Sequence, residues 1–234
     1  MVFFERAELL IGKEKINSLI NKRVAVFGVG GVGGFTVEAL ARSGVGEIHI
    51  FDGDTVDESN INRQIIALNS SVGQDKVKVF EERLKQINPD IKVKAKKIFF
   101  MPENSNEIAF ENYDYVVDAV DTVTAKIEII RKAKEKSVPV ITCMGTGGKL
   151  DPLSLRIADI SKTSVCPLAR VMRKELKDRG ITGVLALYSL EEPIKPTTSC
   201  FENCKKQKQP SMIFVPASAG LLIAKQVVMD LISK

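Results

Sequence analysis

The residues best suited to phosphate chemistry begin with a glycine-rich run. Gly28-Val29-Gly30-Gly31-Val32-Gly33 follows an apolar segment, 23–27, and precedes residues with helical spacing. Glycine lets the backbone turn tightly and approach a phosphate, and a helix N-terminus offers free N–H donors with partial positive charge. The run alone is weak evidence, but between a strand and a helix it predicts a nucleotide-binding turn.

Asp52 is the second candidate. It stands at the end of the next apolar segment, 47–51, where a carboxylate can accept hydrogen bonds from both hydroxyls of a ribose. The alternative is that Asp52 only caps a turn. We favour the ribose role.

Further charged residues go beyond what a dinucleotide dehydrogenase needs. Asp54, the segment 59–64 with Arg63, then Lys76 and Asp121 follow in order along the chain. Arg63 and Lys76 can neutralise charge as pyrophosphate leaves, and Asp121 can hold Mg²⁺. Taken singly, each is more often a surface ion-pair partner. In this order and spacing they predict a site for a triphosphate and a divalent metal.

The elements that position these residues are read from apolar periodicity. Runs rich in Val, Ile and Phe alternate with amphipathic helical patterns, which predicts an α/β, Rossmann-like doubly wound fold with a mostly parallel sheet flanked by helices. The expected strands are 23–27, 47–51, 91–95, 115–119, 138–144 and 184–188. The expected helices run from the glycine turn to 43, then 72–87, 124–136, 167–179 and from 217 onward.

Length and composition fit one domain. The chain has 234 residues, of which 44% are hydrophobic, enough for a full core. We expect a nucleotide-binding core over 1–150, and a substrate-facing extension with a C-terminal helix over 151–234. The net charge of +5 suits a nucleic-acid or phosphorylated partner without proving one.

Other features concern location. Charged residues interrupt the apolar N-terminus, so no signal segment is expected. The four cysteines form no disulfide framework in a chain of this size, which favours a reducing cytoplasm. The uncharged stretch 209–224 contains Pro216 and is short for a membrane span. It predicts a docked C-terminal helix, and membrane contact is not expected.

These motifs together resemble the ubiquitin-activating-type adenylyltransferases (the ThiF/MoeB/HesA superfamily), over roughly residues 5–155. The resemblance implies ATP and Mg²⁺, with Asp121 on the metal. The nucleotide-binding residues it implies are Gly28, Gly30, Gly31, Gly33, Asp52, Asp54, Ser59, Asn60, Arg63, Gln64, Lys76, Asp121 and Thr122. It assigns catalysis to Arg63, Lys76 and Asp121, together with Arg6, which in relatives reaches the ATP of the neighbouring subunit. A homodimer is therefore expected.

The second half of the chain indicates which branch of this superfamily the chain resembles. It lacks the paired CxxC motifs of a structural zinc site. The segments 147–152, 159–163, 167–170 and 218–221 instead resemble the tRNA threonylcarbamoyladenosine dehydratases, which extends the likeness over nearly the whole chain. It implies that a threonine carboxylate on a modified tRNA adenosine is activated as an acyl-adenylate and then cyclised. Cys166 stands where relatives commonly have Asp, and Ala186 where some have Cys, so no catalytic thiol is expected.

Three alternatives remain. The first is an adenylyltransferase for the C-terminal Gly-Gly of a ubiquitin-like sulfur-carrier protein, and the others are a nicotinamide-dependent oxidoreductase and a non-catalytic ATP-sensing scaffold. A sulfur-transfer or redox protein partner also stays open.

Two basic segments are candidate tRNA surfaces. Arg170, Arg173, Lys174 and Lys177 follow helical spacing that places them on one face. The alternative is a solvated helix face. A second candidate patch is 205–208, where a solubilising run is equally plausible. The single histidine, His49, alternates with apolar residues on a strand, so we expect a structural role for it.

Overall fold

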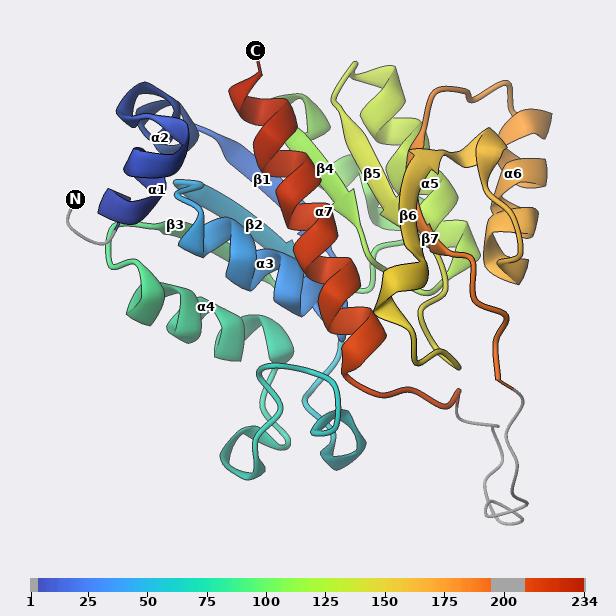
Figure 1. Ribbon diagram of the computed structural model, residues 1–234, viewed down its shortest axis with the longest axis horizontal. Coiled ribbons are helices and arrows are strands. Elements are labelled where there is room, and N and C mark those ends of the chain that lie inside the picture. The colour runs from blue at the N-terminus through green and yellow to red at the C-terminus, as the bar shows by residue number, and fades with distance from the viewer. Residues whose placement is uncertain (1–3, 195–208, 234) are drawn as a thin grey trace.

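A single twisted sheet runs through the protein. The computed structural model describes residues 4–194 and 209–233. Within this part the strand order is β3-β2-β1-β4-β5-β7-β6, and only β6 runs antiparallel to its neighbour (Figure 1). The strands are β1 (Arg23–Phe27), β2 (Glu47–Phe51), β3 (Lys92–Lys96), β4 (Tyr115–Asp118), β5 (Val140–Cys143), β6 (Leu155–Asp159) and β7 (Leu185–Ser189). The expected doubly wound α/β fold is confirmed.

Helices cover both faces of the sheet. One face packs against α2 (Lys13–Ile20), α3 (Gly33–Arg42), α4 (Lys76–Ile87) and α7 (Phe214–Ile232). The other packs against α5 (Val123–Glu135) and α6 (Pro167–Asp178). The short helix α1 (Glu5–Ile11) has no buried residue. Each face therefore has its own apolar core.

Strand β1 contributes side chains to both apolar cores. Val24 and Val26 pack with α3 and α7, while Ala25 and Phe27 face the α5 side. Successive side chains of a strand point to opposite faces, so a strand buried on both sides reads as a continuous apolar run. The expected strand 23–27 is confirmed for this reason.

The edge strand β6 was not predicted. Only its first residue, Leu155, is buried, and the other four are exposed or half-buried. Its sequence, Leu155-Arg-Ile-Ala-Asp159, therefore lacks the apolar run that marks the interior strands. β6 and β7 extend the sheet that the first half of the chain begins.

Helix α4 begins at Lys76, later than the expected start at 72. The backbone at Gly73 has φ +86°, which a right-handed helix cannot adopt. Residues 73 and 74 instead exchange backbone hydrogen bonds of 2.8 Å with Val56. The helical spacing of apolar residues extends back to Val72, but the backbone turn at Gly73 keeps residues 72–75 out of the helix.

The C-terminal helix α7 crosses α3 at a position where a side chain would not fit. A Cβ on Gly220 would lie 2.4 Å from the carbonyl oxygen of Val32 and 2.7 Å from Cβ of Phe35. The hydroxyl of Thr36 donates to the Gly220 carbonyl at 3.1 Å. α7 is long and apolar enough to cross a membrane, but 50% of that stretch is buried in the protein, as the expectation of a docked helix requires.

We predict that Gly220→Ala lowers the free energy of unfolding by about 1–3 kcal/mol, although Ala is the better helix former, because the added methyl group forces α7 away from α3. Urea unfolding followed by circular dichroism measures the change. The exposed residue Lys225 of the same helix is the control, and Lys225→Ala should leave stability nearly unchanged. A wild-type value for Gly220→Ala would contradict the proposed close contact.

Candidate functional site

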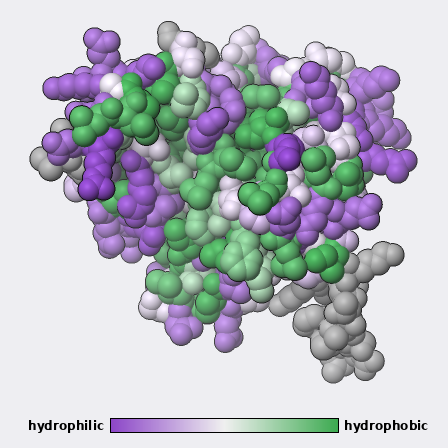
Figure 2. Space-filling view, in the orientation of Figure 1, coloured by the Kyte–Doolittle hydropathy of each residue, from purple (hydrophilic) through white to green (hydrophobic). Residues whose placement is uncertain are grey.

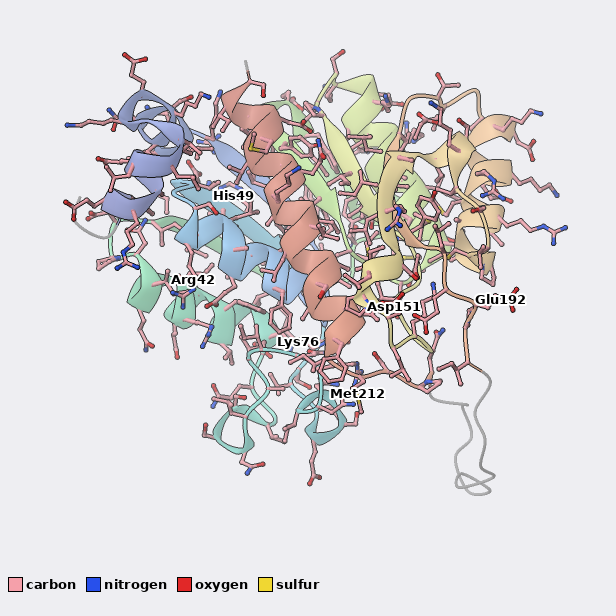
Figure 3. All side chains as sticks on the ribbon, in the orientation of Figure 1. Arg42, His49, Lys76, Asp151, Glu192 and Met212 are labelled. Atoms are coloured by element: carbon pink, nitrogen blue, oxygen red, sulfur yellow. The ribbon has the colours of Figure 1, made fainter. Side chains whose placement is uncertain are left out.

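A cavity of about 720 Å³ opens at the carboxyl ends of β1, β2, β4 and β5. The carboxyl ends of parallel strands meet at one edge of a sheet, which is where open α/β folds bind ligands. Figure 3 labels Lys76 and Met212 toward this end of the molecule, and His49 higher on the sheet. Most of the nucleotide-binding residues expected from the sequence line this cavity; Gly33, Ser59 and Arg6 do not.

The turn 28–33 requires glycine both for its backbone conformation and for its close contacts with neighbouring atoms. Gly28 has φ +81°, and a Cβ there would lie 2.7 Å from the carbonyl oxygen of Ala119. A Cβ on Gly33 would lie 1.8 Å from the carbonyl oxygen of Gly28. Gly28, Gly30 and Gly31 line the cavity. Gly33 does not line the cavity. Because it has no side chain, α3 can begin in close contact with the turn that follows β1.

Asp52 connects the ends of β1 and β2. The backbone N–H of Val29 donates to its Oδ2 at 2.8 Å, and the N–H of Asp54 donates to its Oδ1 at 2.9 Å. The carboxylate therefore holds the turn, as in the simpler alternative. It also lines the cavity, and each oxygen keeps a further lone pair for a ligand hydroxyl.

Lys76 is a buried cation at the start of α4. Its Nζ lies 2.8 Å from Oδ2 of Asp54, whose side chain is half exposed. An antiparallel bridge between Thr55 and Asp75 brings the two together, and the N–H of Lys76 donates to the Asp54 carbonyl. A lysine paired to a half-exposed carboxylate at a cavity wall can exchange that partner for a phosphate.

The segment 57–64 folds into a short turn that presents Arg63 and Gln64. The Asp57 side chain accepts from the N–H of Ser59, and the Arg63 guanidinium donates to the Ser59 carbonyl at 2.7 Å. Ser59 thus supports Arg63. Oε1 of Gln64 is buried and has no hydrogen-bond partner in the described part of the chain. An amide can present either its oxygen or, after rotation, its NH₂ to a ligand.

Asp121 and Thr122 follow β4, and both are exposed at the cavity. A buried network beneath them was not predicted. Oδ2 of Asp118 lies 3.0 Å from Nζ of Lys126 and accepts from the Thr142 hydroxyl, with Asp118 and Lys126 both fully buried. The network joins β4, α5 and β5, and so fixes the turn that carries Asp121. The sequence signal that could have revealed this network is Lys126, a lysine within an apolar helical stretch, eight residues after Asp118.

The sequence predicted no site residue in the half of the cavity beyond β5. Cys143, Met144, Gly145 and Lys149 line it, together with the start of α6. Burial raises the pKa of the Cys143 thiol to about 12. At neutral pH this thiol is protonated and therefore a poor nucleophile.

Several expected residues lie outside the cavity. Arg6 is exposed on α1. His49 is buried, with Nε2 2.7 Å from a Glu47 carboxylate oxygen and Nδ1 3.0 Å from the Tyr113 hydroxyl. This agrees with the structural role expected for it. The segment 205–208, Cys200 and Cys204 lie outside the described residues.

The basic face expected on α6 needs one correction. The Arg173 guanidinium donates to the carbonyl oxygen of Thr163 at 2.7 Å and to its hydroxyl. Arg173 therefore holds the turn before α6 instead of facing solvent freely. Arg170, Lys174 and Lys177 are exposed, and no ion pair involves them within 4–194 and 209–233.

Comparisons with known proteins give relatives of nearly the whole chain. The ThiF family matches residues 4–231. A tRNA threonylcarbamoyladenosine dehydratase of Bacillus subtilis is 45% identical over 98% of this chain and 94% of its own length. The crystal structure of the Escherichia coli tRNA N6-threonylcarbamoyladenosine dehydratase in complex with ATP matches with a TM-score of 0.90 at 31% identity, covering 99% of this chain and 94% of that one. Its complex with AMP matches with a TM-score of 0.91.

A contrasting match is a probable adenylyltransferase/sulfurtransferase of Mycobacterium tuberculosis, which is 37% identical but covers only 50% of this chain and 29% of its own length. The dehydratases thus match both halves of the cavity, whereas this relative matches half of the chain. With the family matched from residue 4 to residue 231 and a relative 45% identical across both chains, this protein belongs to the ThiF family.

Proposed function

We propose that this protein uses ATP to dehydrate N6-threonylcarbamoyladenosine in tRNA. The observation that carries the proposal is the match to dehydratases over nearly the full chain, including one structure with ATP and one with AMP. The threonyl carboxylate attacks the α-phosphorus and pyrophosphate leaves. A nitrogen of the same substrate then attacks the acyl carbon and loses its proton. AMP leaves with one former carboxylate oxygen, which completes the loss of water.

The nucleotide half of the cavity supplies positioning and charge stabilisation. The glycine turn and the N-terminus of α3 bind phosphate oxygens, and Asp52 accepts from the ribose. Lys76 moves from Asp54 to the phosphates, and with Arg63 it neutralises the charge of the leaving pyrophosphate. Gln64, whose buried oxygen has no partner in the described chain, gains one from the ligand.

Mg²⁺ fits the donor set through Asp121. The described residues contain no cluster of three or more metal-binding side chains, but Mg²⁺ commonly uses only one or two carboxylates together with waters and substrate phosphates. Asp121 is an exposed carboxylate on the cavity wall. The ion would screen the phosphate charges against the approaching carboxylate.

Cyclisation needs no protein nucleophile. The two cysteines in the described chain, Cys143 and Cys166, are both buried, and the Cys143 thiol is protonated at neutral pH because of its raised pKa. Attack by a nitrogen within the substrate removes the need for a covalent enzyme intermediate. A tRNA substrate agrees with action in the cytoplasm.

We infer that two copies of the chain form the working unit. Arg6 lies outside the cavity of its own chain, on a helix whose Leu9 and Leu10 are almost fully exposed. Further apolar side chains gather over α7 and the segment before it, as Figure 2 shows. Those exposed there include Met212, Ile213, Phe214, Leu221 and Leu222. Apolar surface of this kind is typical of subunit interfaces.

The first prediction from the proposed function tests the reaction itself. The protein incubated with ATP, Mg²⁺ and tRNA bearing threonylcarbamoyladenosine should yield AMP, pyrophosphate and a nucleoside lighter by one water, measured by mass spectrometry after nuclease digestion. Asp121→Asn is the matched control. It should keep the fold but lose orders of magnitude in rate, because several kcal/mol of transition-state stabilisation depend on the metal-binding carboxylate. Unchanged nucleoside mass with the wild type, and pyrophosphate exchange only with a Gly-Gly tail, would favour the carrier-protein alternative.

The second prediction tests the subunit arrangement. Heterodimers of an Arg6→Ala chain and an Arg63→Ala chain should recover about half of the wild-type activity, since one site then carries both defects and the other carries neither. The homodimers of each variant should be nearly inactive. Heterodimers isolated with two affinity tags and showing no recovery would place Arg6 at the site of its own chain or outside catalysis.

The third prediction concerns the tRNA surface on α6. If Arg170 and Lys174 neutralise phosphates, replacing both with Ala should flatten the salt dependence of tRNA binding by about one slope unit for each lost contact, and leave ATP binding unchanged. Filter binding across a salt series measures the slope. Lys92→Ala with Lys94→Ala, two exposed lysines on the opposite sheet edge, is the charge-matched control. Coincident curves for all three proteins would show that α6 presents only a solvated face.

A further inference from the structure

Lys149 is a buried cation in the second half of the cavity. Three lysines in the described chain are buried: Lys76 at 5% exposed, Lys126 at 0% and Lys149 at 3%. The first two have carboxylate partners, Asp54 at 2.8 Å and Asp118 at 3.0 Å. Nζ of Lys149 donates to the carbonyl of Gly145 at 2.8 Å, and the ion pairs of the described residues include none with Lys149. Burying an ammonium without a counter-ion is costly.

The surroundings of Lys149 add positive potential. Gly145, which accepts from Lys149, also adjoins the start of α6, since a Cβ on it would lie 3.8 Å from Sγ of Cys166. Pro167 and Leu168, the first residues of this twelve-residue helix, line the cavity. A helix N-terminus carries free N–H donors and partial positive charge. Arg173 fixes this helix start through the Thr163 carbonyl.

The position of Lys149 separates it from the triphosphate. In the sheet, β4 lies between β1 and β5, so the turn that carries Asp121 lies between the glycine turn and the segment that carries Lys149. The phosphate-facing cations Arg63 and Lys76 come from segments after β2. An anion that pairs with Lys149 would therefore be a second one, on the far side of Asp121 from the glycine turn.

We propose that Lys149, with the N-terminus of α6, binds the carboxylate of the threonyl group and presents it to the α-phosphate. The inference rests on the proposed function, which requires a carboxylate nucleophile in this cavity. A carboxylate suits the site because one ammonium and one helix end supply charge-assisted donors for its two oxygens. Lys149 then acts as a substrate-binding residue that selects an acid over its uncharged derivatives.

The test compares two tRNA probes in the presence of a non-hydrolysable ATP analogue. One probe carries threonylcarbamoyladenosine, and the other carries the same group with a primary carboxamide in place of the carboxylate. Wild type should bind the carboxylate probe at least about tenfold more tightly than the carboxamide probe. Lys149→Met should weaken binding of the carboxylate probe by about thirtyfold, the lower range for a buried charge pair that loses one partner. It should change binding of the carboxamide probe less than about twofold.

Two controls keep the outcomes distinct. Lys162→Met removes an exposed lysine and should match wild type with both probes. Affinity for the ATP analogue and the thermal midpoint report whether Lys149→Met is folded; if it is not, Lys149→Gln replaces it, and the wild-type preference between probes still decides. Equal weakening of both probes, or no wild-type preference, would overturn the role of Lys149. Failure of wild type to dehydrate the carboxylate probe with ATP would instead overturn the proposed function.

Discussion

The carboxylate of Asp52 determines the geometry on which the nucleotide half of the cavity depends. One oxygen accepts from Val29 in the turn after β1, and the other accepts from Asp54 in the loop after β2. Asp54 in turn holds Lys76 at the start of α4. One side chain therefore sets the relative positions of two strand ends and one helix start. The glycine turn cannot shift without breaking this connection, so the donors proposed to bind a phosphate are arranged before a ligand arrives, which lowers the cost of ordering them on binding.

A second buried network does the same for the other half of the cavity. Asp118, Lys126 and Thr142 join β4, α5 and β5 with no exposure to solvent. A buried ion pair gives little net stability, but losing one partner leaves an uncompensated charge and is strongly destabilising. The pair therefore makes one arrangement of the β4–α5 turn much more favourable than others. The network thereby holds the backbone of Asp121, three residues after Asp118, in one position, although the Asp121 side chain is exposed.

Sequence reasoning succeeded where the determining interactions are local. The strands 23–27 and 47–51 follow from their continuous apolar runs, and the close turn between the first strand and its helix follows from the glycines at 28 and 33. It failed where the decisive contact lies far away in the chain. Nothing near Lys76 shows that residues 73 and 74 pair with Val56, so the start of α4 was placed too early. β6 was missed because only one of its five residues is buried, so it lacks a continuous apolar run. Lys149 belonged to a recognised motif, yet its burial without a carboxylate partner among the described residues is visible only in three dimensions.

Two incompletely satisfied polar groups of the described chain lie at the cavity. Buried groups are normally satisfied because each unpaired one costs about 1–3 kcal/mol, and more for a charge. In the described chain the amide oxygen of Gln64 lacks a partner, and Lys149 has only a carbonyl. The two stand on opposite sides of the turn that carries Asp121. These are the two places where a nucleotide and a carboxylate would contact the described part of the chain. Part of the favourable energy of binding is therefore the relief of a cost that the unliganded fold already bears. A ligand that lacks the matching charge leaves that cost unrelieved.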